Sequence, residues 1–251
     1  MKLSARHYSM KIVLMTAGGN IDPDLPADFF SKKTEYGIDT VVACDRGYEA
    51  LAAIGVTPDV IIGDFDSVSD RIRENILSED IRIPSGLRSS GPETDNRAET
   101  YMPSCEVIRL NPEKDDTDTE AAIALCIERG AEKIYLFGAT GNRVDHMLGN
   151  IELLAYAADR GCELVILDRH NRIRLATQPL TVTKAGQWGS FISLIPYSPV
   201  VEKLTLRGFK YEVTDFDIKK GNTLGISNEI TAETADISFV SGKLLVIESS
   251  D

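Results

Sequence analysis

Three stretches of helical spacing in this sequence each stop at a glycine. They are Arg46–Ile54, Asp118–Arg129 and Met147–Arg160, followed directly by Gly55, Gly130 and Gly161. Glycine just past a helix is a common stop signal, because it adopts the left-handed conformation that closes the last turn. The first two thirds of the chain therefore contain at least three helices with defined ends.

Short apolar runs, many of them β-branched, alternate with these helices. They predict strands at Lys11–Met15, Asp39–Cys44, Asp59–Ile62, Glu106–Leu110, Lys133–Phe137 and Glu163–Leu167. Most runs are apolar on both faces, which is typical of parallel strands covered by helices. The repeated strand–helix–strand order predicts an α/β fold with a doubly wound, mostly parallel sheet and helices on both faces.

The pattern changes near Ile173, where helical spacing gives way to short alternating runs separated by turn signals. The runs are Leu180–Lys184, Ser190–Ile195, Lys203–Leu206, Thr223–Ile226, Glu229–Ala232, Asp236–Val240 and Lys243–Ile247. Such runs predict a small antiparallel β-sandwich. We therefore expect an α/β domain over residues 10–170 and a β-sandwich domain over residues 173–251.

A formal net charge of -12 limits the partners of this chain. An acidic surface repels the phosphates of nucleic acid, so we expect no DNA or RNA partner. A nucleotide substrate would need metal ions between the carboxylates and the phosphates. No apolar stretch is long enough to predict a membrane span. Four widely spaced cysteines (Cys44, Cys105, Cys126 and Cys162) form no metal-type pair and suit a reducing cytoplasm.

The motif Gly63-Asp64-Phe65-Asp66-Ser67 directly follows a predicted strand. Residues two apart on an extended chain point to the same side, so Asp64 and Asp66 can converge on one ion. Open α/β sheets bind ligands at the carboxyl ends of their strands, and carboxylate oxygens suit Mg²⁺. The same residues also form ordinary solvated turns, so this motif alone leaves both interpretations open.

A second acidic motif spans residues 114–120, before a predicted helix. Thr117 and Glu120 form a capping-box pattern, and Asp118 complements the helix dipole, so part of the motif has a purely structural explanation. That explanation does not cover Asp115 and Asp116. Three aspartates in four residues repel one another unless a cation is present, which favours a second contribution to a metal site.

Two further strand ends carry polar turns. Gly138–His146 contains Gly141, whose backbone can approach an anion, and Arg143, which can bind phosphate oxygens. Asp145 in that segment and Asp45, after another strand, are each also explained as helix caps. Acids gathered at one edge of a sheet, together with Arg143, are nevertheless what a metal–triphosphate site needs.

The stretch Ser85–Ser104 fits neither pattern. It is rich in Ser, Gly, Pro, Arg and Glu and has no periodicity. Long segments of this kind are mobile lids or disordered insertions, and we favour the insertion here.

The motifs taken together resemble the thiamine pyrophosphokinase family. The resemblance is carried by Asp45-Arg46-Gly47, by Ile62–Ser67, by Lys114–Asp118 and by Gly141–His146, in the family's order and spacing. The C-terminal part adds Ser193–Pro196, Gly208–Tyr211 and Gly225–Glu229. The likeness covers nearly the whole chain from Met10, apart from Ser85–Ser104, which is longer than the family leads us to expect.

The resemblance implies transfer of the diphosphate of ATP to the hydroxyl of thiamine, with AMP leaving and Mg²⁺ as the metal. It implies a homodimer in which thiamine lies between the α/β domain of one subunit and the β-domain of the other. Carried over by motif, the site residues fall into three groups. Asp64, Asp66, Asp115 and Asp118 would surround Mg²⁺ and the triphosphate, with Asp64, Asp66 and Asp115 as metal ligands; Asp45, Thr117, Gly141, Arg143 and Asp145 would line the nucleotide and phosphate region; and Tyr211, Ser227 and Asn228 would recognise thiamine.

Other interpretations remain at this point. The acceptor could be another small alcohol, such as a pterin alcohol, or the chain could be a non-catalytic nucleotide or thiamine sensor. Tyr211 and the pair Ser227-Asn228 favour thiamine, since an aromatic face attracts a cationic ligand. The intact acidic motifs favour an enzyme over a sensor. The proton acceptor for the hydroxyl would be Asp66 or Asp118.

Overall fold

The structure is a computed structural model that describes residues 10–66, 105–111, 113 and 115–251. Ser85–Ser104, Ser67 of the first acidic motif and Lys114 of the second lie outside the described residues. None of the helices that the structure describes has the length and apolar character needed to cross a bilayer.

Six parallel strands form the first part of a large sheet, as the sequence predicts. They are β1 (Ile12–Thr16), β2 (Thr40–Cys44), β3 (Val60–Gly63), β4 (Glu106–Arg109), β5 (Lys133–Phe137) and β6 (Glu163–Leu167). Their spatial order is β4-β3-β2-β1-β5-β6, and every neighbouring pair is parallel. The order reverses at β1, so the loops after β1 and β5 meet at a topological switch point, where such sheets bind ligands.

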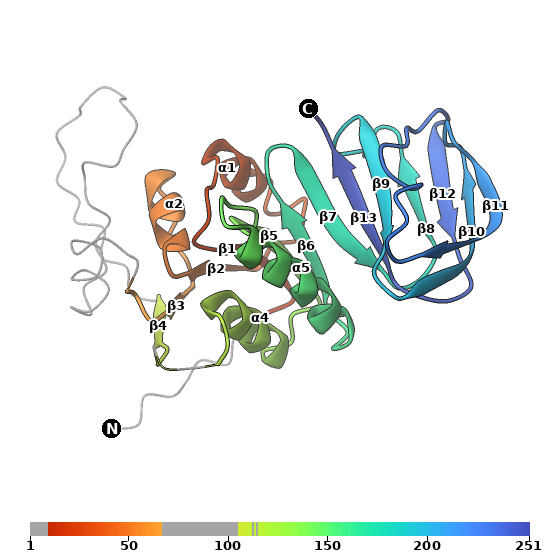
Figure 1. Ribbon diagram of the computed structural model, residues 1–251. Coiled ribbons are helices and arrows are strands. Elements are labelled where there is room, and N and C mark those ends of the chain that lie inside the picture. The colour runs from red at the N-terminus through yellow and green to blue at the C-terminus, as the bar shows by residue number, and fades with distance from the viewer. Residues whose placement is uncertain (1–9, 67–104, 112, 114) are drawn as a thin grey trace.

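Helices cover both faces of this sheet, which confirms the doubly wound architecture (Figure 1). The helices are α1 (Asp24–Ser31), α2 (Gly47–Ala53), α4 (Asp118–Glu128) and α5 (Val144–Ala158). On one face α1 and α2 pack with Leu14 and Val41, and on the other α4 and α5 pack with Val13 and Val42. Alternate residues of a strand thus enter separate cores, which explains why these strands are apolar on both faces.

The glycines after three helices have the expected role. Gly55, Gly130 and Gly161 have φ values of +71°, +94° and +79°. The left-handed backbone costs glycine little, because it has no Cβ. The helix ends predicted from these glycines are correct to within two residues.

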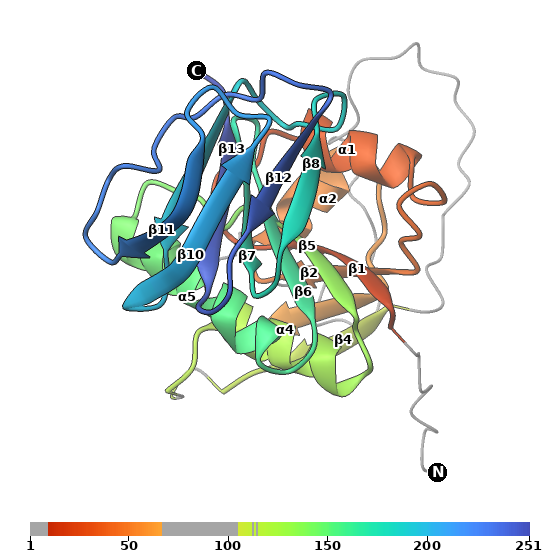
Figure 2. The ribbon, with the colours of Figure 1, turned by 90° about the vertical axis from the view of Figure 1, so that its right-hand side faces the viewer.

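The C-terminal part is antiparallel, but it shares the large sheet. Strands β7 (Asn171–Ala176), β13 (Leu244–Ser249) and β9 (Phe191–Pro196) extend that sheet beyond β6 to nine strands. A second sheet has the order β11-β10-β12-β8, built from Val213–Lys219, Val200–Arg207, Thr234–Ser238 and Leu180–Thr183. Figure 2 shows it facing β7 and β13, and residues of both sheets form one apolar core. This is the expected β-sandwich, joined to the α/β part by continuous strand pairing.

Several local expectations differ from the structure. The helix α1 and the strands β7 and β11 were not expected. The runs Thr223–Ile226 and Glu229–Ala232 form turns and isolated bridges instead of strands. The helix α5 begins three residues before the expected Met147. The boundary expected between residues 170 and 173 falls at the β6–β7 hairpin.

Candidate functional site

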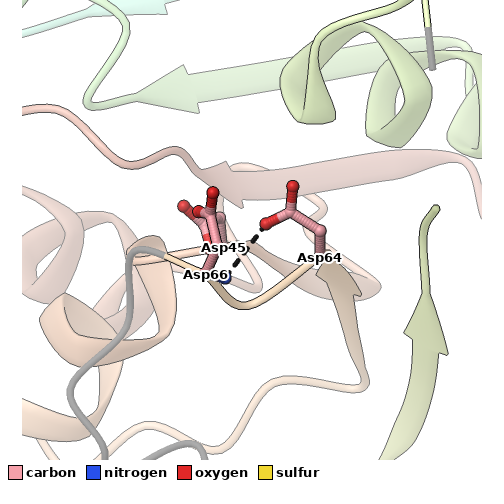
Figure 3. Close-up of side chains that lie close together, drawn as sticks. All are labelled: Asp45, Asp64 and Asp66. Carbon is pink, nitrogen blue, oxygen red and sulfur yellow. Dashed lines mark hydrogen bonds between the residues drawn. The ribbon is translucent and has the colours of Figure 1, made fainter. Parts of the chain in front are cut away.

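Three aspartates converge at the carboxyl ends of two neighbouring strands. Asp45 follows β2, and Asp64 and Asp66 follow β3. One carboxylate oxygen from each lies within 4.8 Å of those from the other two, and Figure 3 shows the side chains side by side. Asp45 and Asp64 are half-buried and Asp66 is exposed. The strand order thus brings these three predicted site residues together in a group open to solvent.

The turn that carries Asp64 and Asp66 differs from the extended chain on which the sequence argument relied. The strand β3 ends at Gly63, and Phe65 has a φ of +62°. The backbone N–H of Asp66 donates to Oδ1 of Asp64 at 3.0 Å. The Phe65 side chain is only 1% exposed and packs in the core with α1 and α2. The buried ring therefore fixes a tight turn, which brings the two carboxylates together.

The donor set of this group fits a magnesium ion. All three possible ligand atoms are carboxylate oxygens, the type that Mg²⁺ prefers. Three carboxylates at this distance repel one another unless a cation or a proton lies between them. Gly63 allows the close approach of the two strand ends, because a Cβ at this position would lie 3.2 Å from Cα of Asp45.

The second acidic motif lies at the start of α4, which follows β4 at the same edge of the sheet. Thr117 is the N-cap residue, and its Oγ1 accepts a hydrogen bond from the backbone N–H of Glu120 at 3.2 Å. Asp115 is exposed, and Asp118 is half-buried in the first turn. Among the described residues, neither belongs to the group of three close carboxylates. Their roles as metal ligand and phosphate neighbour remain predictions.

The glycine-rich turn after β5 places Arg143 and Asp145 at the start of α5. Both are exposed, and they form a bidentate ion pair, with Nε–Oδ1 at 3.2 Å and NH2–Oδ2 at 2.6 Å. The hydrogen bond from Arg143 lowers the pKa of Asp145 to about 2, and the same bond raises the pKa of Arg143. Asp145 is not the N-cap; that position is Arg143. Gly141 lies near the loop after β1, since its Cβ would be 3.7 Å from Cα of Gly19.

The three residues expected at the thiamine site lie together in the β-domain. The backbone N–H of Tyr211 donates to Oδ1 of Asn228 at 3.0 Å, and Nδ2 of Asn228 donates to the carbonyl of Tyr211 at 2.8 Å. Asn228 is 5% exposed, whereas the Tyr211 side chain is exposed. Ser227 has a φ of +56°, and its N–H donates to Oγ of Ser193 at 3.0 Å. The buried amide of Asn228 therefore holds the backbone of Tyr211 in place.

The structure also contains a cavity that was not predicted from the sequence. It has a volume of about 190 Å³ and lies at the switch point, where the loops after β1, β5 and β6 meet. Asn20, Phe137, Thr140 and Asp168 are among its lining residues. The signal was present in the sequence, because Gly18-Gly19-Asn20 and Asp168 also follow predicted strands. Polar residues directly after predicted strands identified the other candidate site residues, and the same criterion applies to these two strand ends.

Two family models match the chain along most of its length. The first, thiamin pyrophosphokinase, catalytic domain, matches residues 32–166, and the second, thiamin pyrophosphokinase, vitamin B1 binding domain, matches residues 177–244. The thiamine pyrophosphokinase of Bacillus subtilis (strain 168) is 31% identical over 244 residues, which cover 96% of this chain and all of the relative.

Solved structures give the same result. The crystal structure of thiamine pyrophosphokinase from Bacillus subtilis has a TM-score of 0.76 at 30% identity, and the match covers 96% of this chain and 100% of the other. The thiamin pyrophosphokinase from Geobacillus thermodenitrificans has a TM-score of 0.72 at 33% identity, with 96% and 98% covered. The likeness extends over both the α/β part and the β-sandwich.

Proposed function

The chain belongs to the thiamine pyrophosphokinase family, and we propose that it transfers the terminal diphosphate of ATP to the hydroxyl of thiamine, releasing AMP. It is therefore an ATP-dependent diphosphotransferase. The observation that carries this function is the match to both domains of the family along nearly the full chain. The cluster of three carboxylates from Asp45, Asp64 and Asp66 supplies a chemical basis for this function within the chain.

The proposed chemistry requires alignment and charge neutralisation more than covalent help from the protein. Asp45, Asp64 and Asp66 would hold Mg²⁺, with Asp115 as a further ligand. Bound Mg²⁺ would neutralise phosphate oxygens of ATP. Arg143 would add a fixed positive charge if it exchanges Asp145 for a phosphate, which its exposed position permits.

Thiamine recognition would come from the β-domain of a second copy of the chain. Tyr211 is 62% exposed, a good position for stacking on a cationic ligand. Exposed apolar side chains lie near both halves of such a site: Val144 and Leu148 on α5, and Leu224 and Ile226 beside Ser227. Apolar surface of this kind supports a homodimer with the active site between subunits.

We place the enzyme in the cytoplasm, as its cysteines suggest. All four are free thiols. Burial raises the pKa of Cys126 to about 12 and that of Cys162 to about 11, so these thiols resist oxidation.

The test of the function is AMP release from Mg-ATP by the purified protein, with and without thiamine. We expect AMP only with thiamine, together with an equal amount of thiamine diphosphate. AMP formed only with another acceptor, such as a pterin alcohol, would contradict the proposed substrate. Binding of ATP and thiamine without any AMP would indicate a sensor.

A further inference from the structure

The exposed ring of Tyr211 already has a positive charge beside it. The ammonium of Lys210 lies over this ring, with Nζ 5.6 Å from the ring centroid. At that distance a cation is attracted to an aromatic face. The Tyr211 side chain is otherwise open to solvent. A cationic ligand that stacks on this ring therefore meets a cation that belongs to the chain itself.

Glu229 holds the ammonium in that position. Its carboxylate oxygen Oε1 accepts a hydrogen bond from Nζ of Lys210 at 2.6 Å, and this bond raises the pKa of Lys210 above its ordinary value of 10.5. The backbone N–H of Lys210 also donates to the carbonyl of Glu229, at 2.9 Å. Lys210 is therefore charged at neutral pH, and both its backbone and its side chain are bound to the same residue.

Opposite charges are balanced around this turn. Beside the first ion pair, Oε2 of Glu212 lies 3.8 Å from NH1 of Arg207, and Oε1 of Glu212 accepts from the backbone N–H of Gly208 at 2.7 Å. The side chains of both pairs are between 40% and 48% exposed, so water screens their charges only in part. Removal of one charged group would therefore leave a net charge close to the ring of Tyr211.

The surroundings of Tyr211 suit a flat cation. Its backbone is bound to the amide of Asn228, and the segment just before Asn228 carries the apolar side chains of Leu224 and Ile226, which are 60% and 44% exposed. These residues lie in the part of the chain that matches the vitamin B1 binding domain, residues 177–244. An aromatic face with apolar side chains nearby favours a ligand that is both aromatic and positively charged.

We propose that Lys210 and Glu229 set the affinity of the Tyr211 site for its cationic ligand. Lys210 competes with the ligand for the ring, and Glu229 supplies the counter-charge that makes binding of a second cation possible. The ligand then stacks on the part of the ring that the ammonium leaves open. This inference rests on the proposed function, since it takes thiamine as the cation. Lys210 and Glu229 thus determine specificity and have no part in the transfer of the diphosphate.

Two variants of similar shape separate the two charges, with the Kd for thiamine measured by calorimetry on the full chain without ATP. Lys210→Met removes the ammonium and leaves the Glu229 carboxylate, so thiamine should bind about fivefold more tightly. Glu229→Gln keeps an acceptor for Lys210 but removes the counter-charge, so thiamine should bind about fivefold less tightly. The double variant keeps the wild-type net charge, and its Kd should lie close to that of the wild type.

Two controls make the test specific for charge at this ring. An uncharged thiophene analogue of thiamine keeps the shape of the ligand without its ring charge, so its Kd should change by less than about twofold in every variant. Lys11→Met and Glu132→Gln make the same changes in an exposed ion pair at the opposite edge of the sheet, just before β1 and β5. They should leave the Kd for thiamine unchanged. Added salt should reduce the differences among the Tyr211-site variants.

The outcomes separate this proposal from the proposed function. Opposite shifts of the Kd for thiamine in Lys210→Met and Glu229→Gln support it, even if no thiamine diphosphate forms. An unchanged Kd in both variants, or weaker binding in both, would overturn it, and normal synthesis of thiamine diphosphate by the same variants would leave the function intact. Equal effects on thiamine and on its uncharged analogue, or no thiamine binding to the wild type and the variants, would also overturn it.

Discussion

Left-handed backbone conformations at single residues coincide with the proposed site. Five described residues other than glycine have a positive φ: Asp45, Phe65, Lys203, Asp215 and Ser227. Three of them belong to motifs expected at the site. Such conformations cost free energy in residues with a Cβ and persist where the surrounding structure enforces them, often at functional sites. At Phe65 the enforcing contact is the burial of its ring.

Asp45→Asn tests the role of the cluster formed by the carboxylates of Asp45, Asp64 and Asp66. Asparagine tolerates the left-handed backbone, so the variant should keep its fold but lose a negative charge at the proposed metal site. We expect turnover to fall by about a hundredfold or more, with a melting temperature close to that of the wild type. The matched control is Asp215→Asn, since Asp215 is exposed and has a φ of 51° against 48° at Asp45. Full activity of Asp45→Asn would show that the Asp45 carboxylate is not needed in the active site.

Asn228→Ala tests whether the buried amide positions Tyr211. Without it, the N–H and C=O of Tyr211 lose their partners, and the turn that carries the ring should loosen. We expect the KM for thiamine to rise by about tenfold while the KM for ATP stays unchanged. Asn228→Asp can still accept from the N–H of Tyr211 and should recover part of the loss. Equal changes in both KM values would indicate a general structural role instead.

The sequence predicts which residue types stand at the strand ends, but not how they are held. The convergence of Asp64 and Asp66 with Asp45 follows from strand order, because neighbouring parallel strands end at one edge. The left-handed turn at Phe65 does not follow from spacing, since it depends on a core that forms only when α1 and α2 pack on the sheet. The contact between Asn228 and Tyr211 likewise needs two turns, 17 residues apart, to fold against each other.

At the scale of helices and strands, the sequence predicted correctly those elements whose signals lie within a few consecutive residues. The helices that end at glycines and the strands that are apolar throughout were predicted, because a few neighbouring residues are enough to identify each pattern. The helix α1 was missed because Pro23 and Pro26 lie at its start and suggest a loop, although proline is tolerated in a first turn. The strand β11 was missed because it is an edge strand with exposed Asp215 and Asp217.

The pair Glu106–Arg129 tests how α4 is tied to the edge strand β4. Arg129 donates to both carboxylate oxygens of Glu106, at 2.6 and 2.9 Å, and this hydrogen bond holds the pKa of Glu106 below its ordinary value of 4.5. A lowered pKa in the folded state stabilises the protein above pH 4.5, and this contribution is lost as the pH falls through the lowered value.

Glu106→Gln should therefore lower the free energy of unfolding at pH 7 by no more than about 1 kcal/mol, because the side chain of Glu106 is 38% exposed and screened by water. The difference from the wild type should shrink below pH 4.5 in urea titrations. Glu128→Gln, a change at an exposed residue of α4 next to Arg129, is the control. A difference that stays constant down to pH 3 would show that the ion pair is not its cause.

At the scale of the whole molecule, the two parts are joined more closely than the sequence suggests. A change of pattern near Ile173 predicts separate domains, but β7, β13 and β9 continue the sheet of the α/β part. Strand pairing between β7 and β13 joins residues about 70 positions apart, and no local pattern specifies it. The orientation of the β-domain is thus fixed by hydrogen bonds of a shared sheet.

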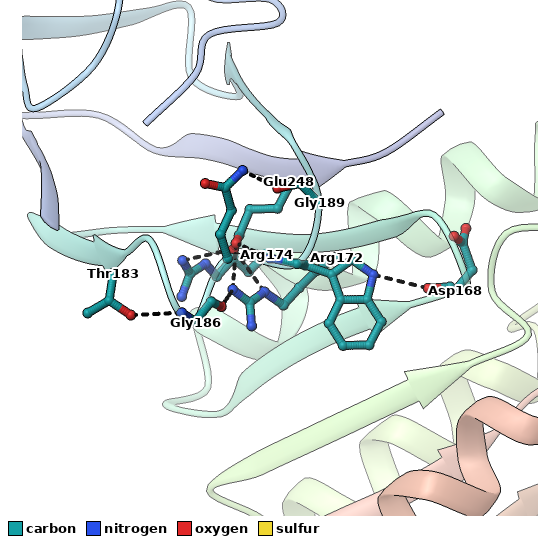
Figure 4. A network of polar contacts seen from close by, with 9 residues as sticks. Asp168, Arg172, Arg174, Thr183, Gly186, Gly189 and Glu248 are labelled. Atoms are coloured by element: carbon teal, nitrogen blue, oxygen red, sulfur yellow. Dashed lines mark hydrogen bonds and ion pairs between the residues drawn. The ribbon is translucent and has the colours of Figure 1, made fainter. Parts of the chain in front are cut away.

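Glu248 lies at the centre of this junction and provides the last test. It is fully buried, and its carboxylate accepts from Arg172 at 2.5 and 2.8 Å, from Arg174 at 3.1 Å and from the backbone N–H of Trp188 at 3.0 Å (Figure 4). Glu248→Ala leaves two largely buried arginines without their anion. We expect it to lower the free energy of unfolding by about 3–5 kcal/mol in urea titrations followed by Trp188 emission. Lys243→Ala, which removes a partly exposed ion pair with Asp159, should cost less than about 1 kcal/mol. Equal losses in the two variants would mean that the junction depends on strand pairing and packing, with no special contribution from the buried carboxylate.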